Sequence, residues 1–408
     1  MREERRRTWK CEPKRNVSLK LVLSFSISRT FGILIFRSHP YVYVTIKLAL
    51  PREHTGRPRL GQTGGCRPRE GCWLGQPIGL TIDMARYVVR QKLRGRKRFP
   101  MVLMLEPTEQ CNLTCTGCGK IRQSEEVLKL RMSADECFAA IDECGAPAVS
   151  IAGGEPLVHP EIVAIVNGML ARRKLTLLCT NGILLQRVLD KLEPHPRFSF
   201  VFHLDGPRDH HDRMVERKGV YDTVVKGIRA AKERGFRVTT NTTLYTGADP
   251  AEIGGFLRGM TALGVDNCLI SPAFTYEEVD ASHGDIFLRR EAAAKMVREI
   301  VAAAGPAVHY YNTPMYLDFL MGKKDLMCKP WGMPNRNPKG WKGPCYLLTD
   351  AHYDTFEELM ARTEWEDFGY GRNPRCASCM MHSGYETAAV DAMTPKDAWK
   401  MMRWMFAS

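Results

Sequence analysis

Three cysteines lie close together in the segment CNLTCTGC, at Cys111, Cys115 and Cys118. Thiolates are soft ligands that suit iron–sulfur clusters or zinc. A cubic cluster has four irons, so three thiolates hold three of them and leave the fourth free to chelate a small molecule. A closed zinc site needs a fourth ligand of its own, and none completes that set within the loop. The spacing therefore favours a cluster with one open iron.

A Gly-Gly-Glu-Pro run follows about 35 residues later, at Gly153, Gly154, Glu155 and Pro156. Glycines let the backbone approach a ligand closely, and a carboxylate suits an ammonium group. Together the two motifs resemble those of the radical S-adenosylmethionine (SAM) superfamily. The resemblance implies that the three cysteines hold a [4Fe–4S] cluster, that its open iron binds the amino and carboxylate groups of SAM, and that the Gly-Gly-Glu-Pro run contacts the methionyl amino group.

From residue 101 onward, strand-like segments alternate with helical ones, which is typical of parallel strands joined by crossover helices. Six such units are predicted, with strands at 101–108, 148–153, 174–182, 198–206, 236–244 and 267–272. The predicted fold is therefore α/β, a partial (β/α)6 barrel related to the TIM barrel and of the radical SAM type. Binding residues are expected on the loops that follow the strands.

Polar side chains do follow these strands. Asn181, Asp205 and Asn241 come at or just after the ends of strands three, four and five, and Ser271 lies near the end of strand six. Each alone is most simply a loop-capping residue. Together they predict one polar mouth, in which Asn181, Asp205 and Asn241 bind ribose hydroxyls or the methionyl group of SAM.

The charge divides the chain into regions. Residues 1–100 hold 23 Lys or Arg against 6 Asp or Glu, a net charge of +17, whereas residues 101–408 carry −3. We predict a basic extension of little order over 1–75, with a start site assigned too far upstream as an alternative, and a basic amphipathic helix over 76–100. The barrel core follows over 101–305, and a cysteine-containing substrate extension over 306–408.

A neutral core argues against nucleic acid as a partner, and a basic front end favours peripheral contact with the inner face of a membrane. The expected location is the cytoplasm.

A narrower resemblance rests on several collinear segments. Between about residues 76 and 393 the chain resembles the adenosylhopane synthase (adenosyl-hopene transferase) family of hopanoid biosynthesis. The segments that carry it are RQKLRGRKRFP, VLMLEPTEQCNLTCTGCGK, DECGAPAVSIAGGEPLVH, LCTNGILL, HLDGPRDHHD, KPWGMPNR and CASCMMHSGYE. The resemblance implies that a 5′-deoxyadenosyl radical adds to the exocyclic alkene of diploptene, with flavodoxin or ferredoxin as electron donor.

Cys179, in the third strand, is the catalytic residue that this resemblance implies. A cysteine in LTLLC is most often core filler, but a thiol at the barrel mouth can donate a hydrogen atom to a carbon radical. The rigid hydrocarbon substrate predicts a wide apolar pocket. Candidate lining residues are Phe274, Tyr276, Tyr310, Tyr311, Met315, Tyr316, Leu317, Phe319 and Leu320.

Four more cysteines lie near the C-terminus, at Cys328, Cys345, Cys376 and Cys379. They fit either a second metal site or four reduced thiols, and the resemblance implies a further cysteine where this chain has Ser383.

Two rival functions stay open. The first is another radical SAM enzyme with a C-terminal auxiliary site that modifies a peptide or small molecule. The second is a non-enzymatic iron–sulfur or zinc protein, which would not explain the Gly-Gly-Glu-Pro run.

Overall fold

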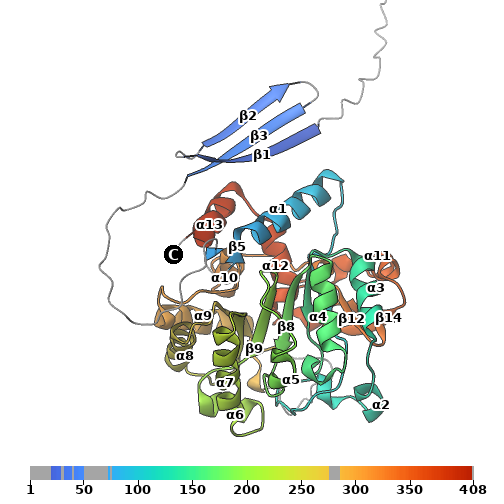
Figure 1. Cartoon of the computed structure of the whole chain (residues 1–408), viewed down its shortest axis with the longest axis vertical. Coiled ribbons are helices and arrows are strands. Elements are labelled where there is room, and N and C mark those ends of the chain that lie inside the picture. Colours follow the sequence, from blue (N-terminus) through green and yellow to red (C-terminus); the bar gives the residue numbers. More distant parts are fainter. Residues whose placement is uncertain are drawn as a thin grey trace, which may run out of the picture. The chain divides into compact units, whose positions relative to one another are not determined.

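The computed structural model describes residues 20–28, 32–38, 41–49, 72–73, 76–274 and 285–406 (Figure 1). The chain divides into two compact units, Met1–Arg67 and Pro68–Ser408. The first unit contains a three-stranded sheet in the order β1-β3-β2, formed by β1 (Lys20–Ser28), β2 (Gly32–Ser38) and β3 (Tyr41–Ala49).

Within the range 1–75, for which little order is predicted, the structure describes these three strands. They are rich in β-branched and aromatic residues, which favour strand pairing over the surrounding proline- and glycine-rich sequence. The remainder of that prediction falls mostly outside the described residues. A short hairpin, β4 (Cys72–Trp73) with β5 (Gln76–Pro77), begins the described part of the second unit.

A parallel sheet forms the centre of the second unit. Its six strands lie side by side in chain order, as the alternating pattern predicts, and each pairs in parallel with the next. They are β6 (Val102–Leu105), β7 (Ala148–Ile151), β8 (Leu175–Thr180), β9 (Phe198–His203), β10 (Arg237–Leu244) and β11 (Asn267–Pro272). The predicted α/β class and partial barrel are confirmed.

Crossover helices cover one face of this sheet (Figure 1). Ser133 and Glu136 form a capping box at the start of α3, and Asp249 caps α8. The helices of this part are α2 (Glu125–Leu128), α3 (Ala134–Cys144), α4 (Ile162–Ala171), α5 (Gln186–Leu189), α6 (Arg208–Met214), α7 (Val220–Glu233), α8 (Pro250–Ala262) and α9 (Arg290–Ala304), with 3-10 turns η1 (Lys120–Arg122) and η2 (Pro156–Val158).

The C-terminal extension continues the same sheet beyond β6, giving nine strands in the order β11-β10-β9-β8-β7-β6-β12-β13-β14. Its first strand is parallel to β6, and the next two are antiparallel. Its elements are α10 (Pro314–Leu320), η4 (Pro330–Gly332), β12 (Asn335–Asn337), β13 (Gly340–Pro344), β14 (Thr349–Tyr353), α11 (Phe356–Arg362), η5 (Trp365–Asp367), η6 (Pro374–Cys376), α12 (His382–Asp391) and α13 (Pro395–Phe406). The extension therefore builds directly onto the barrel.

Strand alternation decides which side chains face the barrel interior. On β9, Phe198, Phe200 and Phe202 are fully buried on the helix-covered face, where Phe202 lies beside α7. Val201 and His203, which alternate with these phenylalanines along the strand, therefore face the interior. The register pairs Cys179 with Val201 and Asn241 with His203, so these side chains share the interior face.

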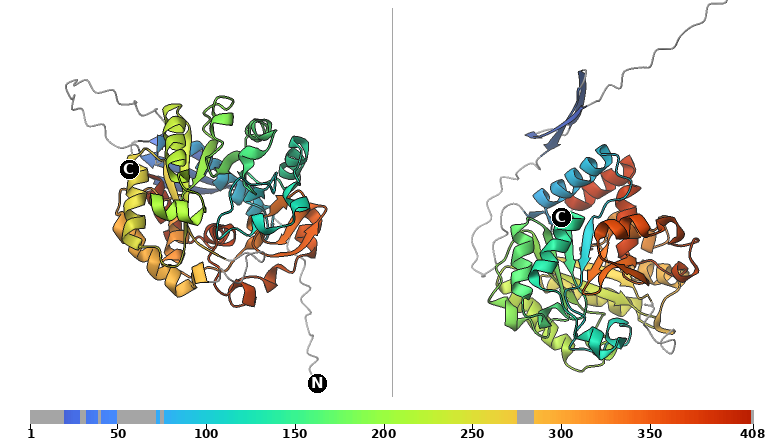
Figure 2. Two further views of the ribbon diagram at one scale, coloured as in Figure 1. Left: turned by 90° about the horizontal axis from the view of Figure 1, so that it is seen from below. Right: turned by 90° about the vertical axis from the view of Figure 1, so that its right-hand side faces the viewer.

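The predicted amphipathic helix is α1 (Ile78–Leu93), and it packs against the body of its own unit beside α13 (Figures 1 and 2). Leu80 is buried, the Tyr87 hydroxyl donates to the Pro100 carbonyl at 2.6 Å, and Arg197 pairs with Asp83 at 2.5 Å. Leu93, at the end of the helix, is strongly exposed, at 66%. Within the described ranges, no helix is long and apolar enough to cross a membrane.

Candidate functional site

A cavity of about 270 Å³ opens at the carboxyl end of the parallel strands. The cysteine loop and the Gly-Gly-Glu-Pro run form one part of its wall, and strand-end residues form another. Its lining includes Cys111, Cys115, Cys118, Gly153, Gly154, Glu155, Pro156, Cys179, Thr180, Asn181, His203, Asn241, Thr243, Tyr245 and Ser271. The sequence motifs therefore meet at one mouth, as predicted from the strand ends.

Backbone amides of the cysteine loop point toward its sulfurs. The amides of Leu113 and Asn112 donate to Cys111, and those of Lys120 and Ile121 donate to Cys118. Such donors stabilise a thiolate ligand. Without a metal, burial raises the pKa of the Cys111 thiol to about 11.

The described side chains of this loop do not form a ready site for a single metal ion. Across the part of the chain that the structure describes, no group of three or more His, Cys, Asp or Glu side chains is arranged to hold one ion. A cubic cluster has a different requirement, because each thiolate binds a different iron and the sulfurs need not converge on one point. The donor set and its geometry therefore fit a cluster better than zinc.

A buried ion network anchors the end of the cysteine loop. Sequence reasoning missed it, because its residues cannot be distinguished from ordinary surface charges by their types and spacing. The Lys120 ammonium lies 2.5 Å from Glu106 Oε2 and 3.4 Å from Glu109 Oε2, and all three side chains are buried. Removing one partner of such a group leaves an uncompensated buried charge. The network ties the loop to the end of β6.

The two glycines of the Gly-Gly-Glu-Pro run are required by close backbone packing. A Cβ on Gly154 would lie 2.1 Å from the Gln110 carbonyl oxygen, and one on Gly153, whose φ is +105°, would lie 2.5 Å from that of Thr108. Only glycine fits both positions. The end of β7 is thereby pressed against the segment that leads into the cysteine loop.

Glu155 joins the ends of β7 and β8. Its buried carboxylate accepts hydrogen bonds from the Leu157 and Asn181 amides, at 3.0 and 2.7 Å, and from the Thr180 hydroxyl at 2.7 Å. Burial raises its pKa. The carboxylate therefore organises the mouth, and its predicted contact with the methionyl ammonium stays a prediction.

The three polar residues predicted to bind SAM have different surroundings. Asn181 lines the cavity and donates to Asn112 of the cysteine loop at 2.7 Å. Asn241 also lines it, and its side-chain oxygen is buried without a hydrogen-bond partner in the described structure. An unsatisfied acceptor facing a cavity fits a ligand hydroxyl, such as that of a ribose.

Asp205 lies beneath the lining and not in it. Its carboxylate lies 2.9 Å from His203 Nε2 and accepts from the Thr243 amide at 3.1 Å. Although burial opposes ionisation, the charge and hydrogen bond of His203 hold the pKa of Asp205 well below its usual range. His203 lines the cavity in its place. Sequence reasoning missed His203, although it lies two residues before Asp205 in the same motif.

Cys179 faces the cavity. The sequence alone does not determine which face of the strand carries this side chain, and the structure places it on the interior face. Its sulfur lies 3.5 Å from the Ser150 hydroxyl on the neighbouring β7. Burial raises the pKa of this thiol to about 11, so it carries its hydrogen at neutral pH. A protonated thiol in the same cavity as the cluster cysteines is chemically able to donate a hydrogen atom.

The far wall of the cavity is apolar, but most of the lining residues predicted for it are elsewhere. Phe274 lines the cavity together with Phe287, Tyr346, Met381 and His382. Tyr276 lies outside the described residues. The predicted residues that are absent from the lining are Tyr310, Tyr311, Met315, Tyr316, Leu317, Phe319 and Leu320. Those on α10 belong to the hydrophobic core. Phe319, for example, stacks on Tyr385 with the two ring centroids 4.2 Å apart.

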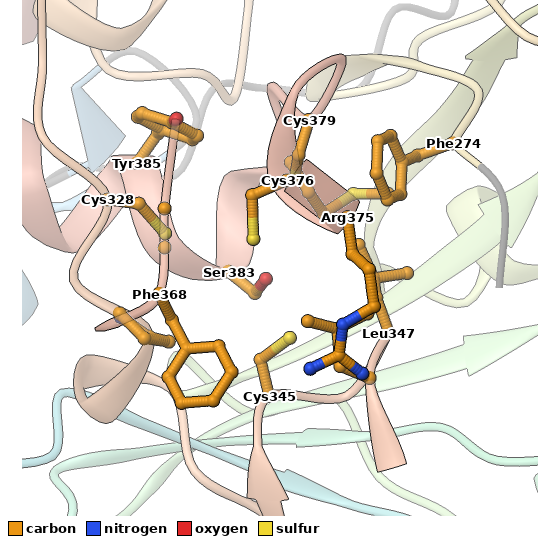
Figure 3. Close-up of a pocket in the computed structure, with 15 residues that line it drawn as sticks. Phe274, Cys328, Cys345, Leu347, Phe368, Arg375, Cys376, Cys379, Ser383 and Tyr385 are labelled. Atoms are coloured by element: carbon orange, nitrogen blue, oxygen red, sulfur yellow. The ribbon is translucent and has the colours of Figure 1, made fainter. Parts of the chain in front are cut away.

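The four C-terminal cysteines surround a second, smaller cavity (Figure 3). They therefore do not contribute to the mouth of the barrel.

Comparison with known proteins agrees with this geometry. Residues 105–258 match the family model of the radical SAM superfamily. The chain carries a radical SAM domain. Such a domain binds a [4Fe–4S] cluster and SAM. The cysteine sulfurs that accept hydrogen bonds from backbone amides fit the cluster, and the unsatisfied Asn241 oxygen fits a hydroxyl of SAM. Residues 268–403, which follow the radical SAM domain, match a domain of unknown function (DUF3463).

The curated relatives resemble the radical SAM part of the chain. GTP 3′,8-cyclase 1 of Mycobacterium tuberculosis is 29% identical over 189 residues, covering 43% of this chain and 52% of that protein. Molybdenum cofactor biosynthesis protein 1 of Drosophila melanogaster is 31% identical over 170 residues, which cover 38% of this chain and 29% of that protein. The chain therefore spans about half or less of the length of these relatives.

A solved structure extends the likeness in fold beyond the radical SAM domain. SuiB of Streptococcus suis superposes with a TM-score of 0.52 at 15% identity, covering 78% of this chain and 81% of SuiB. SuiB bound to SAM gives a TM-score of 0.50 at 14% identity, covering 65% and 64%. At this identity the likeness concerns the fold alone.

Proposed function

We propose that this chain is a radical SAM enzyme that joins the 5′-deoxyadenosyl group of SAM to the exocyclic alkene of diploptene, forming adenosylhopane. The observation that carries the proposal is the position of the Cys179 thiol, which faces the same cavity as the three cluster cysteines. Addition of a radical to an alkene leaves a carbon radical that needs a hydrogen atom. A thiol at the mouth supplies one.

When bound, the cluster and SAM supply a 5′-deoxyadenosyl radical. The residues of the mouth hold the 5′ carbon near the alkene and exclude other hydrogen donors. Cys179 then gives its hydrogen to the tertiary carbon radical, forming a C–H bond and leaving a sulfur radical. One electron and one proton restore the thiol. With the electron that cleaves SAM, each product requires two electrons, supplied by a one-electron donor such as flavodoxin or ferredoxin.

The charge of the lining argues against a nucleoside triphosphate as the substrate. The curated relatives are named as GTP cyclases, and triphosphates are bound through Arg and Lys side chains. None of the described residues that line this cavity is a lysine or arginine. The neighbouring sequence from 275 to 284, TYEEVDASHG, also has none. An apolar wall of Phe274, Phe287 and Met381 suits a hydrocarbon better.

A second candidate is a radical SAM enzyme that modifies a peptide. It is favoured by the extension with four cysteines around one cavity, on a fold similar to that of SuiB, which has been solved bound to a precursor peptide. In that case the apolar wall would bind side chains of a peptide, and the product would carry no adenosyl group.

The test is an anaerobic assay of the reconstituted, reduced chain with SAM, with and without diploptene, read by mass spectrometry. The proposal predicts a product whose mass is that of diploptene plus the 5′-deoxyadenosyl group and one hydrogen. If only 5′-deoxyadenosine forms, at the same rate in both samples, the radical SAM activity stands and the alkene substrate is wrong. If a protein with an intact cluster does not cleave SAM, the enzymatic function is wrong.

A further inference from the structure

A second group of cysteines encloses a cavity of about 30 Å³ in the C-terminal extension (Figure 3). The sulfurs of Cys345 and Cys376 point toward each other across it, with the Ser383 hydroxyl between them. Cys328 and Cys379 complete the ring of thiols, and none of the four forms a disulfide. Four reduced thiols around one small cavity form a complete ligand set for a metal centre.

Segments far apart in the chain bring these cysteines together. Cys328 precedes η4, Cys345 follows β13, Cys376 ends η6, and Cys379 lies just before α12. Cys376 and Cys379 are only three residues apart, whereas Cys328 and Cys345 come from two other segments of the extension. Gathering four thiols from three segments requires the extension to fold around them.

Backbone amides point at the sulfurs here as they do in the cysteine loop of the barrel. Leu347 and Leu348 donate to Cys345, and Met381 donates to Cys379. The donors lie two or three residues after the cysteine, as do Leu113 at Cys111 and Lys120 and Ile121 at Cys118. Amide donors of this kind stabilise metal-bound thiolates and tune their clusters.

The surroundings favour a negatively charged centre. Arg375 lines the cavity, where it pairs with Asp350 at 2.7 and 2.9 Å. Arg372 donates to the Cys328 carbonyl at 3.1 Å, and Arg290 donates to that of Cys379 at 2.8 Å. These guanidinium groups lie around the thiols and partly offset the charge of a thiolate cluster.

Close packing fixes Cys328. A Cβ on Gly384 would lie 2.2 Å from the Cys328 sulfur, so α12 approaches this cysteine through a residue without a side chain. The sulfur is thereby held at the start of the helix that follows Cys379.

We propose that Cys328, Cys345, Cys376 and Cys379 bind a second iron–sulfur cluster, of the [4Fe–4S] type. One zinc ion would need all four sulfurs about 2.3 Å from a single point. The described residues offer no such convergence, whereas a cubic cluster separates its four thiolates. With four protein ligands the second cluster has no open iron and no place for SAM. It abuts the mouth of the barrel, since Phe274 and Met381 line both cavities.

The experiment removes the first cluster and asks what remains. The full chain with Cys111, Cys115 and Cys118 all replaced by alanine is reconstituted anaerobically with iron and sulfide. Iron, sulfide and zinc are then measured, and the reduced protein is studied by electron paramagnetic resonance. The expected result is about four irons and four sulfides per chain, with a spectrum that SAM does not change, against about eight irons in the wild type.

The matched variant carries Cys345→Ala and Cys376→Ala and keeps the barrel cysteines. It should retain about four irons, and its spectrum should respond to SAM. If it does not fold, the barrel variant still decides the question. A barrel variant that takes up no iron and sulfide, or one zinc per chain instead, would overturn the proposal. These readouts do not depend on the substrate, so their failure is distinct from failure of the proposed function.

Discussion

The two cysteine sites of this chain are built in opposite ways. At the barrel mouth, Cys111, Cys115 and Cys118 come from one loop of eight residues and lie in a cavity of about 270 Å³. In the extension, Cys328, Cys345 and the neighbouring residues Cys376 and Cys379 come from three separate segments around a cavity of about 30 Å³. The first site places three thiols beside open space, and the second encloses four thiols in a small cavity.

This difference suits the first site to catalysis and the second to electron transfer or structural support. An iron without a protein ligand, next to space for SAM and a second substrate, is suited to chemistry. A full set of protein ligands in a small cavity is suited to electron transfer or to holding the fold. Amide-to-sulfur hydrogen bonds occur at both sites, so they do not distinguish the two proposed roles. The number of ligands and the free volume distinguish the two.

Replacing Cys115 by alanine should give the largest effect. Loss of one of three ligands should remove the barrel cluster, so SAM cleavage should fall to the detection limit and the iron content by about four per chain. Iron analysis and a 5′-deoxyadenosine assay measure both. Cys137→Ala, at a buried position on α3, is the control and should retain both. Normal SAM cleavage by the Cys115→Ala protein would remove the distinction between the two sites.

Cys179→Ser should separate radical formation from product formation. Serine keeps nearly the same volume and can still bond to Ser150, but its O–H bond is too strong to donate a hydrogen atom. We expect adduct formation to fall at least about tenfold, or about 1.4 kcal/mol in barrier, while the iron content stays unchanged. Adduct and 5′-deoxyadenosine are quantified in the same reaction. Unchanged adduct yield would show that another group donates the hydrogen.

Ser150→Ala tests whether the neighbouring hydroxyl positions the thiol. The 3.5 Å contact between Ser150 and Cys179 is one hydrogen bond, and losing it should lower the adduct formed per SAM cleaved by about 2- to 10-fold. Ser199→Ala is the control, because Ser199 is a buried strand serine whose hydroxyl bonds to the adjacent Phe200 carbonyl and not to Cys179. An equal yield of adduct per SAM cleaved in the two variants would exclude a positioning role for Ser150.

A pH effect on stability should arise in the extension. Burial raises the pKa of Glu386 on α12 from 4.5 to about 7, although its carboxylate accepts two hydrogen bonds from Thr313. The folded state therefore keeps this proton after the unfolded chain has lost it, and stability should fall as the pH rises from about 4.5 to 7. The loss is at most about 3 kcal/mol.

Thermal unfolding of the wild type and of Glu386→Gln at pH 5 and pH 8 measures this effect. The amide cannot ionise and preserves the contacts with Thr313, so the variant should lose less stability between the two values. An equal loss in both proteins would place the pH dependence elsewhere.

The barrel and its mouth were predictable because their signals are local. The six strands follow from composition, and the cysteine loop and the Gly-Gly-Glu-Pro run are each contained in a few residues. The position of Cys179 on the interior face was not predictable, because it depends on the register between β8 and β9. His203 was missed for the same reason, since only that phase brings it into the cavity while Asp205 lies beneath.

The extension was less predictable because its contacts are long-range. The sequence suggested a metal site at four cysteines but not that η6, α12 and two loops would surround one cavity. It also suggested substrate contacts for α10, where Tyr316 and Phe319 are instead fully buried core residues. Aromatic residues at helical spacing fit both roles, and only the packing of α10 against α12 distinguishes them.

The most direct test of the proposed chemistry is to run the reaction with diploptene in deuterium oxide. The Cys179 hydrogen exchanges with solvent, so the thiol will carry deuterium when it meets the tertiary carbon radical. The account predicts an adenosyl adduct with one non-exchangeable deuterium at that carbon, located by mass spectrometry and nuclear magnetic resonance. An adduct without deuterium would contradict hydrogen donation by Cys179, and the absence of any adduct would contradict the proposed reaction.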